Sequence, residues 1–299
     1  MNFQIETSNH CNFECGYCPN KDMKRKREFM SDQVWDKILN QYVIPYRHVA
    51  NSDSPPTAIF HKDSETLLDR KLPGRLKALP SDIKVDIYSN GVLLPAWRKR
   101  GEDFIELLAS LPNKCRLLLS YHPRNHDNSA NDYSGVIAYL REVLKDPPKN
   151  VEFITVSHKS KWVSEDMQLA WARCWSDLPI TVHANCSINP WTGRMEEHAT
   201  CAYNGCPYAD FGHWFFGVTG NIIACCLDLE EEIVLGNVLV DDPKDMYTKT
   251  AEFYYEQRKT LAEKRRPKHA VCDNCYGYNR NDRGVVGTAD LIQLGVPAV

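Results

Sequence analysis

Several features that would place a chain in a special class are missing from these 299 residues. No run of about 18 apolar residues is present, so no segment is predicted to span a membrane. The N-terminus carries no basic stretch followed by an apolar core, and a secretion signal is therefore not expected. Internal repeats and low-complexity tracts are also absent, which excludes solenoid architectures. We expect a globular, cytoplasmic protein.

Neither sign of charge dominates the sequence. The 36 Lys and Arg residues are nearly balanced by 39 Asp and Glu residues, and a net charge of -3 does not favour general nucleic-acid binding. No G-x-G-x-x-G motif follows a predicted strand, so a dinucleotide cofactor is not indicated. Hydrophobic residues make up 43% of the chain, enough for a large core in one or two domains.

Cysteine, in contrast, is abundant, with twelve residues. An even number allows six disulfides, but clustered cysteines in a long chain without a secretion signal favour metal binding or catalysis. Three of them, Cys11, Cys15 and Cys18, form a C-x3-C-x2-C group. Thiolates suit soft metals and iron–sulfur clusters. Three ligands leave one iron of a four-iron cluster open to a small molecule.

This triplet follows a predicted strand at residues 1–7 and has an aromatic residue, Tyr17, before its last cysteine. The arrangement resembles the radical SAM superfamily. In that family the open iron binds the amino and carboxylate groups of S-adenosylmethionine, and one electron from the cluster releases a 5′-deoxyadenosyl radical. The alternatives are a zinc site or three buried thiols. Zinc ligands usually come in pairs, and no pair accompanies this triplet locally.

Strands and helices alternate along the first two thirds of the chain. Strands are predicted at residues 1–7, 57–60, 83–88, 115–120, 151–156 and 180–183; helices are predicted at 34–42 (after a Ser31 cap), 72–78, 104–111, 136–144 and 167–175. This alternation predicts an α/β fold with parallel strands. The resemblance implies a partial (β/α)6 TIM-type barrel over residues 1–195 and a small C-terminal α+β domain over residues 196–299. Chemistry in such barrels takes place at the carboxyl ends of the strands.

Residues after the second, third and fourth strands match cofactor-binding positions of the family. Many relatives carry Gly-Gly-Glu-Pro after the second strand; here residues 63–66 keep only the carboxylate, which can hold an ammonium group or simply cap a helix. Ser-Asn-Gly follows the third strand, and its glycine permits a tight turn. The resemblance implies five contacts to S-adenosylmethionine: Tyr17, Glu65, Ser89, Asn90 and Ser120.

A second set of cysteines lies near the C-terminus. Cys206 is followed by a Gly-x4-Cys segment ending at Cys225, and then by the pair Cys272 and Cys275. This order resembles the SPASM/twitch extension of radical SAM enzymes, and the absence of cysteines after Cys275 favours the shorter twitch form. The resemblance implies one auxiliary 4Fe–4S cluster bound by these four residues. Four cysteines would also suit a structural zinc.

Other residues are candidates for contact with a substrate. A thiol near the cavity can donate a hydrogen atom to a substrate radical, and Cys186, Cys201 and Cys226 are the candidates. Polar and aromatic residues that follow the fourth and sixth strands are candidate substrate contacts: Tyr121, His122, Arg124, His183, Asn185, Trp191 and Arg194. The basic run at residues 21–27 is either a solvated surface or a contact for an anionic substrate or a reductase.

These observations predict a radical SAM enzyme, with a hydrogen abstraction that leads to oxidation, epimerisation or isomerisation of a small molecule or peptide. The resemblance implies two 4Fe–4S clusters, S-adenosylmethionine, and an electron donor of the flavodoxin or ferredoxin type. Two other classes stay open. One is radical modification of a nucleotide or nucleic acid, and the other is a non-enzymatic zinc-binding or redox-sensing protein.

Overall fold

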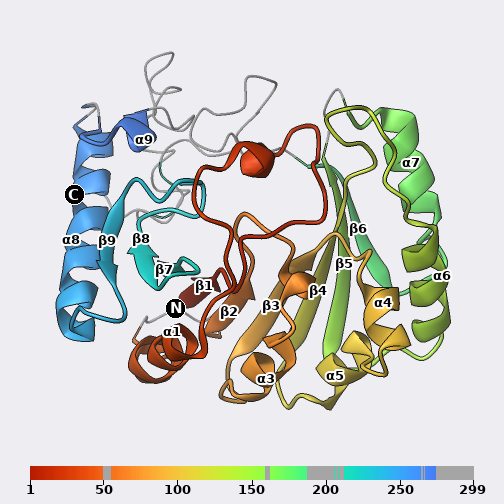
Figure 1. Cartoon of the computed structure of the whole chain (residues 1–299), viewed down its shortest axis with the longest axis horizontal. Helices are drawn as coiled ribbons and strands as arrows, with labels where there is room; N and C mark the ends of the chain where they lie inside the picture. The colour runs from red at the N-terminus through yellow and green to blue at the C-terminus, as the bar shows by residue number, and fades with distance from the viewer. Residues whose placement is uncertain are drawn as a thin grey trace.

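Six parallel strands follow one another along the chain and form one continuous sheet (Figure 1). The structure is a computed structural model that describes residues 1–49, 55–158, 162–186, 206, 208, 212–263, 265 and 267–273. The six strands are β1 (Asn2–Ile5), β2 (Thr57–Phe60), β3 (Lys84–Ser89), β4 (Cys115–Tyr121), β5 (Val151–His158) and β6 (Ile180–Cys186). Each pairs in parallel with the next. The predicted α/β fold with a partial barrel is confirmed.

The helices between these strands agree with the predicted ones, with one addition. They are α1 (Asp32–Lys37), the π-helical η2 (Ile38–Val43), α2 (Ile44–Tyr46), α3 (Leu72–Lys77), α4 (Leu94–Lys99), α5 (Phe104–Ser110), α6 (Ser134–Val143) and α7 (Glu165–Arg173). Ser31 caps α1 as predicted, because its hydroxyl accepts a hydrogen bond from Val34 N at 3.2 Å. The sequence prediction missed α4. Its N-cap position is Leu93, which offers no side-chain cap, so the usual signal for a helix start is lacking.

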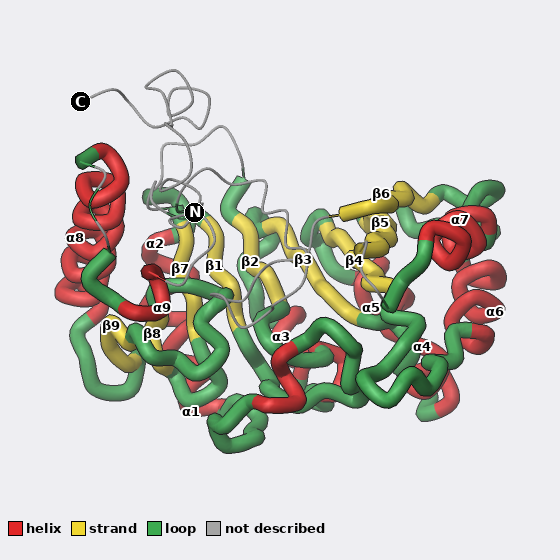
Figure 2. Tube along the Cα trace, turned by 90° about the horizontal axis from the view of Figure 1, so that it is seen from above, coloured by secondary structure: helices red, strands yellow, loops and turns green. Residues whose placement is uncertain are grey.

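The C-terminal segment extends the same sheet beyond β1. Strand β7 (His213–Phe216) pairs in parallel with β1, and β8 (Asn221–Ile223) and β9 (Val234–Asn237) continue the sheet in antiparallel fashion. Helix α8 (Pro243–Ala262) and the short α9 (Ala270–Asp273) complete the described chain. Figure 2 shows the strands as an arc, with α6 and α7 near one end and α8 near the other. The expected boundary near residue 195 lies outside the described residues.

Aromatic side chains join the two parts of the sheet in one core. Tyr42 of η2 packs edge-on against Trp214 and Phe216 of β7, with ring centroids 5.1 and 5.4 Å apart. All three side chains are buried, as are Phe3 and Ile5 of the neighbouring β1. Burial of this much apolar surface makes β7 part of the barrel core and fixes its position beside β1. In the described part of the chain, no helix is both long and apolar enough to cross a lipid bilayer.

Candidate active site

A cavity of about 320 Å³ lies at the carboxyl ends of the strands and brings the predicted cofactor residues together. It is lined by all three cysteines of the N-terminal triplet and by all five predicted cofactor contacts: Cys11, Cys15, Cys18, Tyr17, Glu65, Ser89, Asn90 and Ser120. These residues come from four separate loops or strand ends. Their common location follows from the parallel sheet, since the carboxyl ends of all its strands meet at one edge.

The loop that carries the three cysteines is held by the segment after β4. Gly16 N donates to Arg124 O at 3.3 Å, Glu14 N donates to the Asn125 side-chain oxygen at 3.2 Å, and His126 N donates to Glu14 O at 3.0 Å. The sequence prediction missed this bracing, because contacts between segments about 110 residues apart leave no local signal. The loop is therefore positioned by the sheet as well as by its own turns.

Burial makes the three thiols poor acids. It raises the pKa of Cys11 to about 11 and that of Cys18 to about 12, and the pKa of Cys15 higher still, with the neighbouring thiolates adding to the effect. Thiolates at these positions would need nearby positive charge, and iron supplies it. Among the described residues, no group of three or more His, Cys, Asp or Glu side chains is arranged to hold a single metal ion. A cluster is larger than an ion and needs ligands further apart, so three thiols at one cavity, one buried and two half-buried, fit a cluster.

Glu65 lines the cavity and caps a helical turn, which is one of its two predicted roles. Its carboxylate accepts hydrogen bonds from Ser89 Oγ at 2.7 Å, Asn90 N at 2.8 Å and Leu67 N at 3.0 Å. The last of these caps the 3₁₀ turn η3 (Thr66–Leu68). A carboxylate offers about four lone-pair sites, so one remains for a ligand. Burial raises the pKa of Glu65, and a cationic ligand group would favour its charged form.

The turn after β3 also connects to the cysteine loop. Asn90 Nδ2 donates to the Asn12 side-chain oxygen at 2.9 Å, and Ser89 Oγ accepts from Gly91 N at 2.8 Å. Gly91 has φ +79°, and a Cβ there would lie 3.0 Å from the Leu119 side chain, so glycine is required. Ser89 and Asn90 are thus structural residues of the turn that also face the cavity.

Among the described residues suggested as substrate contacts, His122 alone lines the cavity. Its ring forms a hydrogen bond with the Tyr17 hydroxyl. Tyr121 instead stacks on Trp171 with ring centroids 4.4 Å apart, which places it against α7. The Arg124 guanidinium donates to Asn128 O at 2.8 Å. His183 is exposed; the Asn185 side chain, Trp191 and Arg194 lie outside the described residues.

His61 is a cavity residue that the sequence prediction missed, although its position directly after β2 was a signal. Its ring stacks on Tyr88 with centroids 4.9 Å apart. Burial lowers the pKa of His61 to about 4, so the imidazole is neutral near pH 7. Its buried Nδ1 has no hydrogen-bond partner among the described residues, and it is therefore available to a ligand.

The basic run after the cysteine loop is only partly a solvated surface. Arg25 is half-buried among carboxylates: its guanidinium donates to Glu6 at 3.0 and 3.1 Å, to Glu231 at 2.6 Å and to Asp63 at 3.3 Å. Arg27 donates to Asn9 O at 2.6 Å and holds the cysteine loop at its base. The expectation that the whole run faces solvent or a partner is wrong for these two residues. No sequence pattern separates them from their exposed neighbours, because their partners lie elsewhere in the fold.

The buried charges next to Arg25 connect the cavity with the C-terminal part. Lys62 lines the cavity, pairs with Asp63, and donates to Asp228 O at 3.0 Å. Burial raises the pKa of Asp63, although Lys62 and Arg25 act in the opposite direction. Buried charges are tolerated when they are paired and hydrogen-bonded. This network places the segment after β8 directly against the loop after β2.

The C-terminal thiols gather around one tyrosine. Tyr254 of α8 is buried and donates to Ala224 O at 2.7 Å. Its pKa is raised well above the usual value by burial and by the nearby thiols: Cys206, Cys225, Cys226 and Cys272. Three predicted cluster ligands from distant segments thus lie within electrostatic range of one side chain. The fourth, Cys275, lies outside the described residues.

Cys226 stands next to a predicted ligand and makes its own contacts. Its thiol lies 2.9 Å from the Tyr208 hydroxyl. A hydrogen bond between the two adjacent thiols holds the pKa of Cys225 well above and that of Cys226 below the ordinary value. Of the other suggested hydrogen donors, the Cys186 side chain and Cys201 lie outside the described residues.

A partial parallel barrel with a three-cysteine loop at its carboxyl edge is the fold of radical SAM enzymes. The predicted resemblance is confirmed in the fold and in the C-terminal domain. Residues 206–276 match the SPASM family, an iron–sulfur cluster-binding domain. This chain therefore carries a SPASM domain after its barrel.

Solved structures match nearly the whole chain. BtrN in complex with AdoMet and 2-DOIA is 19% identical with a TM-score of 0.60, and the match covers 92% of each chain. Native anSMEcpe with bound AdoMet is 16% identical with a TM-score of 0.54, over 91% of this chain and 88% of that one. Its complex with AdoMet and the Cp18Cys peptide is 17% identical with a TM-score of 0.51, over 91% and 87%. No match was found among curated proteins. The predicted cofactor classes agree with the matched domain family and with the AdoMet in these structures.

Proposed function

We propose that this protein is a radical SAM enzyme with one auxiliary 4Fe–4S cluster. The observation that carries the proposal is that the three thiols of the triplet line one cavity together with Glu65 and the turn at Ser89 and Asn90. A 4Fe–4S cluster bound there with S-adenosylmethionine would supply one-electron cleavage of the cofactor to a 5′-deoxyadenosyl radical.

The residues around the thiols have separate tasks in this proposal. Glu65 keeps one acceptor site for the cofactor's ammonium group, and Ser89 and Asn90 hold that carboxylate in place. Tyr17 offers an aromatic face for the adenine ring. The surrounding strands and the bracing after β4 exclude water, which is needed because a carbon radical would react with other groups before it met the substrate.

The substrate side of the cavity favours net oxidation in this proposal. Abstraction of a hydrogen atom leaves a substrate radical, which must lose an electron and a proton to become a stable oxidised product. His61 lies in the cavity as a neutral imidazole with an unpaired buried Nδ1, so it can accept the proton. In this proposal the auxiliary cluster accepts the electron. Support comes from Lys62, which lines the cavity and donates to Asp228 O, three residues after the predicted ligand Cys225.

The substrate class is proposed from the matched structures. The cavity of about 320 Å³ would also hold the cluster and S-adenosylmethionine, so its volume does not set the size of the substrate. We favour a small molecule, since the match to BtrN with 2-DOIA covers both chains nearly completely. A peptide remains the alternative, given the match to anSMEcpe with a bound peptide.

The test is anaerobic reconstitution with iron and sulfide, followed by reduction with dithionite in the presence of S-adenosylmethionine. We expect about eight irons per chain, from two four-iron clusters, and formation of 5′-deoxyadenosine. One zinc and four irons would refute the auxiliary cluster. A reconstituted protein that forms no 5′-deoxyadenosine would refute the radical SAM activity. His61→Ala should slow product formation more than 5′-deoxyadenosine formation.

A further inference from the structure

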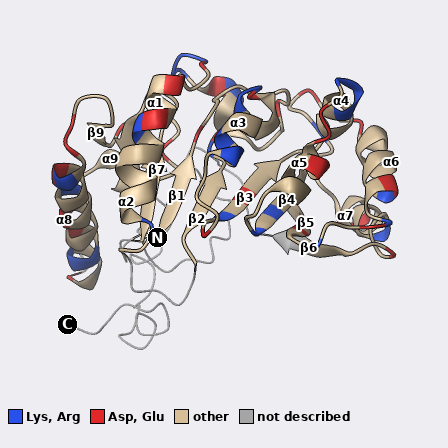
Figure 3. Cartoon of the chain, turned by 90° about the horizontal axis from the view of Figure 1, so that it is seen from below, with Lys and Arg blue, Asp and Glu red and all other residues tan. Residues whose placement is uncertain are grey.

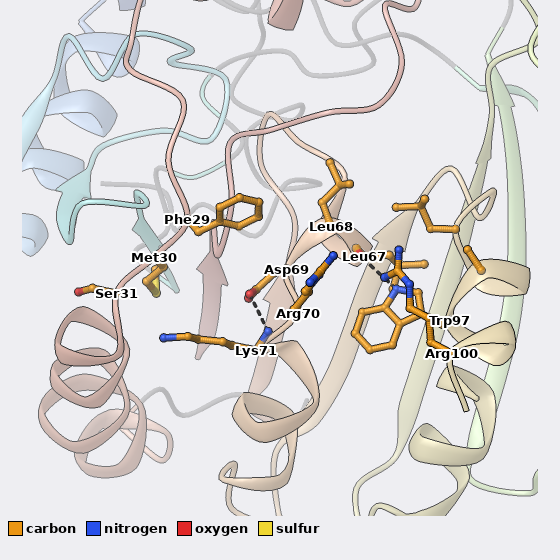
Figure 4. Close-up of a pocket in the computed structure, with 12 residues that line it drawn as sticks. Phe29, Met30, Ser31, Leu67, Leu68, Asp69, Arg70, Lys71, Trp97 and Arg100 are labelled. Atoms are coloured by element: carbon orange, nitrogen blue, oxygen red, sulfur yellow. Dashed lines mark hydrogen bonds between the residues drawn. The ribbon is translucent and has the colours of Figure 1, made fainter. Parts of the chain in front are cut away.

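A second cavity lies on the outer side of the cysteine loop. Its volume is about 630 Å³, larger than that of the active-site cavity. Its walls are largely apolar: Phe29 comes from the segment before α1, Leu67 and Leu68 from η3, and Trp97 from α4 (Figure 4). Trp97 is fixed by a hydrogen bond from its indole N–H to Leu67 O at 2.9 Å. The proposed radical chemistry uses none of these side chains.

The outer cavity and the active-site cavity are lined by residues close in the chain, such as Leu67 in the first and Glu65 in the second. The Phe29 ring, whose residue is 50% exposed, stacks on His10 with centroids 4.6 Å apart and planes 20° apart. His10 directly precedes Cys11, and its carbonyl oxygen accepts from Glu65 N at 2.9 Å. Leu67 and Leu68, which follow Glu65 by two and three residues, line the outer cavity. Phe29, His10 and Cys11 thus form a continuous path from the outer surface to a cluster ligand.

The rim of the outer cavity is positively charged. Arg70, Lys71 and Arg100 line it and are exposed. Lys71 is paired with the exposed Asp32 at 2.6 Å, whereas no described carboxylate lies within ion-pairing distance of Arg70 or Arg100. The Asp69 carboxylate is buried and already neutralised by Arg75 at 2.6 Å. Figure 3 shows further Lys and Arg residues on α3 and α4, on the same side of the molecule.

We propose that the outer cavity is the docking site for an acidic electron-carrier protein with a bound flavin, of the flavodoxin type. The inference rests on the proposed function, which requires one electron from outside for each cleavage. The apolar, aromatic cavity fits the apolar ring edge of a flavin, and the unpaired arginines fit acidic side chains around it. A 4Fe–4S cluster held by Cys11, Cys15 and Cys18 would accept one electron from the reduced flavin. The anionic flavin hydroquinone would thereby become the neutral semiquinone, with no proton released.

Direct binding tests the surface without depending on turnover. The anisotropy of a labelled, purified flavodoxin is titrated with the reconstituted protein at low and moderate salt. Arg70→Glu with Arg100→Glu should weaken binding about tenfold or more at low salt and flatten the salt dependence. The matched control, Lys249→Glu with Arg173→Glu, makes the same change of charge at exposed residues of α8 and α7, away from the cavity, and should bind like wild type. Ala96→Phe, which fills the cavity without changing charge, should also weaken binding.

Activity with two reductants separates docking from chemistry. With reduced flavodoxin, the Arg70→Glu/Arg100→Glu variant should show an increased KM for flavodoxin in 5′-deoxyadenosine formation; with dithionite, its rate should equal that of wild type. Equal flavodoxin affinity in this variant, in the control and in wild type would overturn the docking proposal. An increased KM for the substrate with unchanged flavodoxin binding would overturn it as well, because the surface would then serve the substrate. Failure of wild type to cleave S-adenosylmethionine with dithionite would overturn the proposed function itself.

Discussion

The two groups of cysteines are built in opposite ways. Cys11, Cys15 and Cys18 lie within eight residues of one loop, and their spacing alone brings them close. Cys206, Cys225 and Cys272 come from segments separated by 18 and 46 residues, and they meet only because β7, β8 and α8 pack around Tyr254. The arrangement of the first group therefore depends mainly on the residues of its own loop. The second depends on the packing of the whole C-terminal part.

The largest expected effect is at the first group. Replacement of Cys11, Cys15 and Cys18 by alanine should abolish 5′-deoxyadenosine formation and remove about half of the iron, because the loop would hold no cluster while the C-terminal thiols stay in place. Iron analysis and an anaerobic cleavage assay measure both. Cys174→Ala is the control, since this thiol only donates to Ala170 O within α7. Normal cleavage in the triple variant would contradict the assignment.

A change in the second group should separate the two halves of the reaction. Cys272→Ala should still form 5′-deoxyadenosine but lose product, because the electron from the substrate radical would have no acceptor. Both compounds can be quantified in one chromatogram, after iron analysis shows that the first cluster is retained. Product formed at the wild-type rate would show that the auxiliary cluster is structural.

The buried charges between the two groups offer a test of stability. Arg25→Met should lower the free energy of unfolding by about 3–5 kcal/mol, because the carboxylates of Glu6, Asp63 and Glu231 would face each other with only Lys62 to compensate. Thermal unfolding under anaerobic conditions measures the loss. Arg173→Met, at an exposed position on α7, should change stability by no more than about 0.5 kcal/mol. A similar melting temperature for both variants would contradict the role assigned to Arg25.

Two half-buried histidines, one after β2 and one in β7, are neutral near pH 7. Burial lowers the pKa of His61 and of His213 to about 4, below the usual 6.5. Below pH 6.5 the unfolded chain therefore binds protons that the folded chain does not, and stability falls as the pH falls from about 6.5 to 4. The slope is up to about 1.4 kcal/mol per pH unit for each histidine. Melting temperatures between pH 7.5 and 4.5 should show a shallower decline for His213→Gln than for wild type; an identical decline would exclude His213 as a contributor.

The smallest effect concerns the centre of the second group. Tyr254→Phe removes the hydroxyl that donates to Ala224 O and should cost about 1 kcal/mol of stability with the cluster retained. Tyr255→Phe is the matched control, since Tyr255 is 59% exposed on the same helix. Loss of half of the iron in Tyr254→Phe would instead show that the hydroxyl is needed for cluster assembly.

Local sequence signals accounted for much of the fold. The six parallel strands follow short apolar runs, and Ser31 caps the helix that it was expected to cap. Helix α4 escaped prediction because Leu93 gives no capping signal. Parallel pairing of β7 with β1 was also beyond the sequence, since nothing in either short strand specifies a partner more than 200 residues away.

The candidate site shows the same distinction between features with a local sequence signal and features that depend on long-range contacts. By itself the sequence determined the cysteine triplet, the glycine-dependent turn after β3 and the order of the C-terminal cysteines, because each of these depends on spacing within one short segment. Only the tertiary structure decided that Arg25 pairs with Glu6 and Glu231, that His61 lines the cavity, and that Phe29 stacks on His10 beside Cys11. The physical reason is that burial and charge pairing depend on which segments the sheet brings together, and a side chain's own neighbours in the chain carry no record of that.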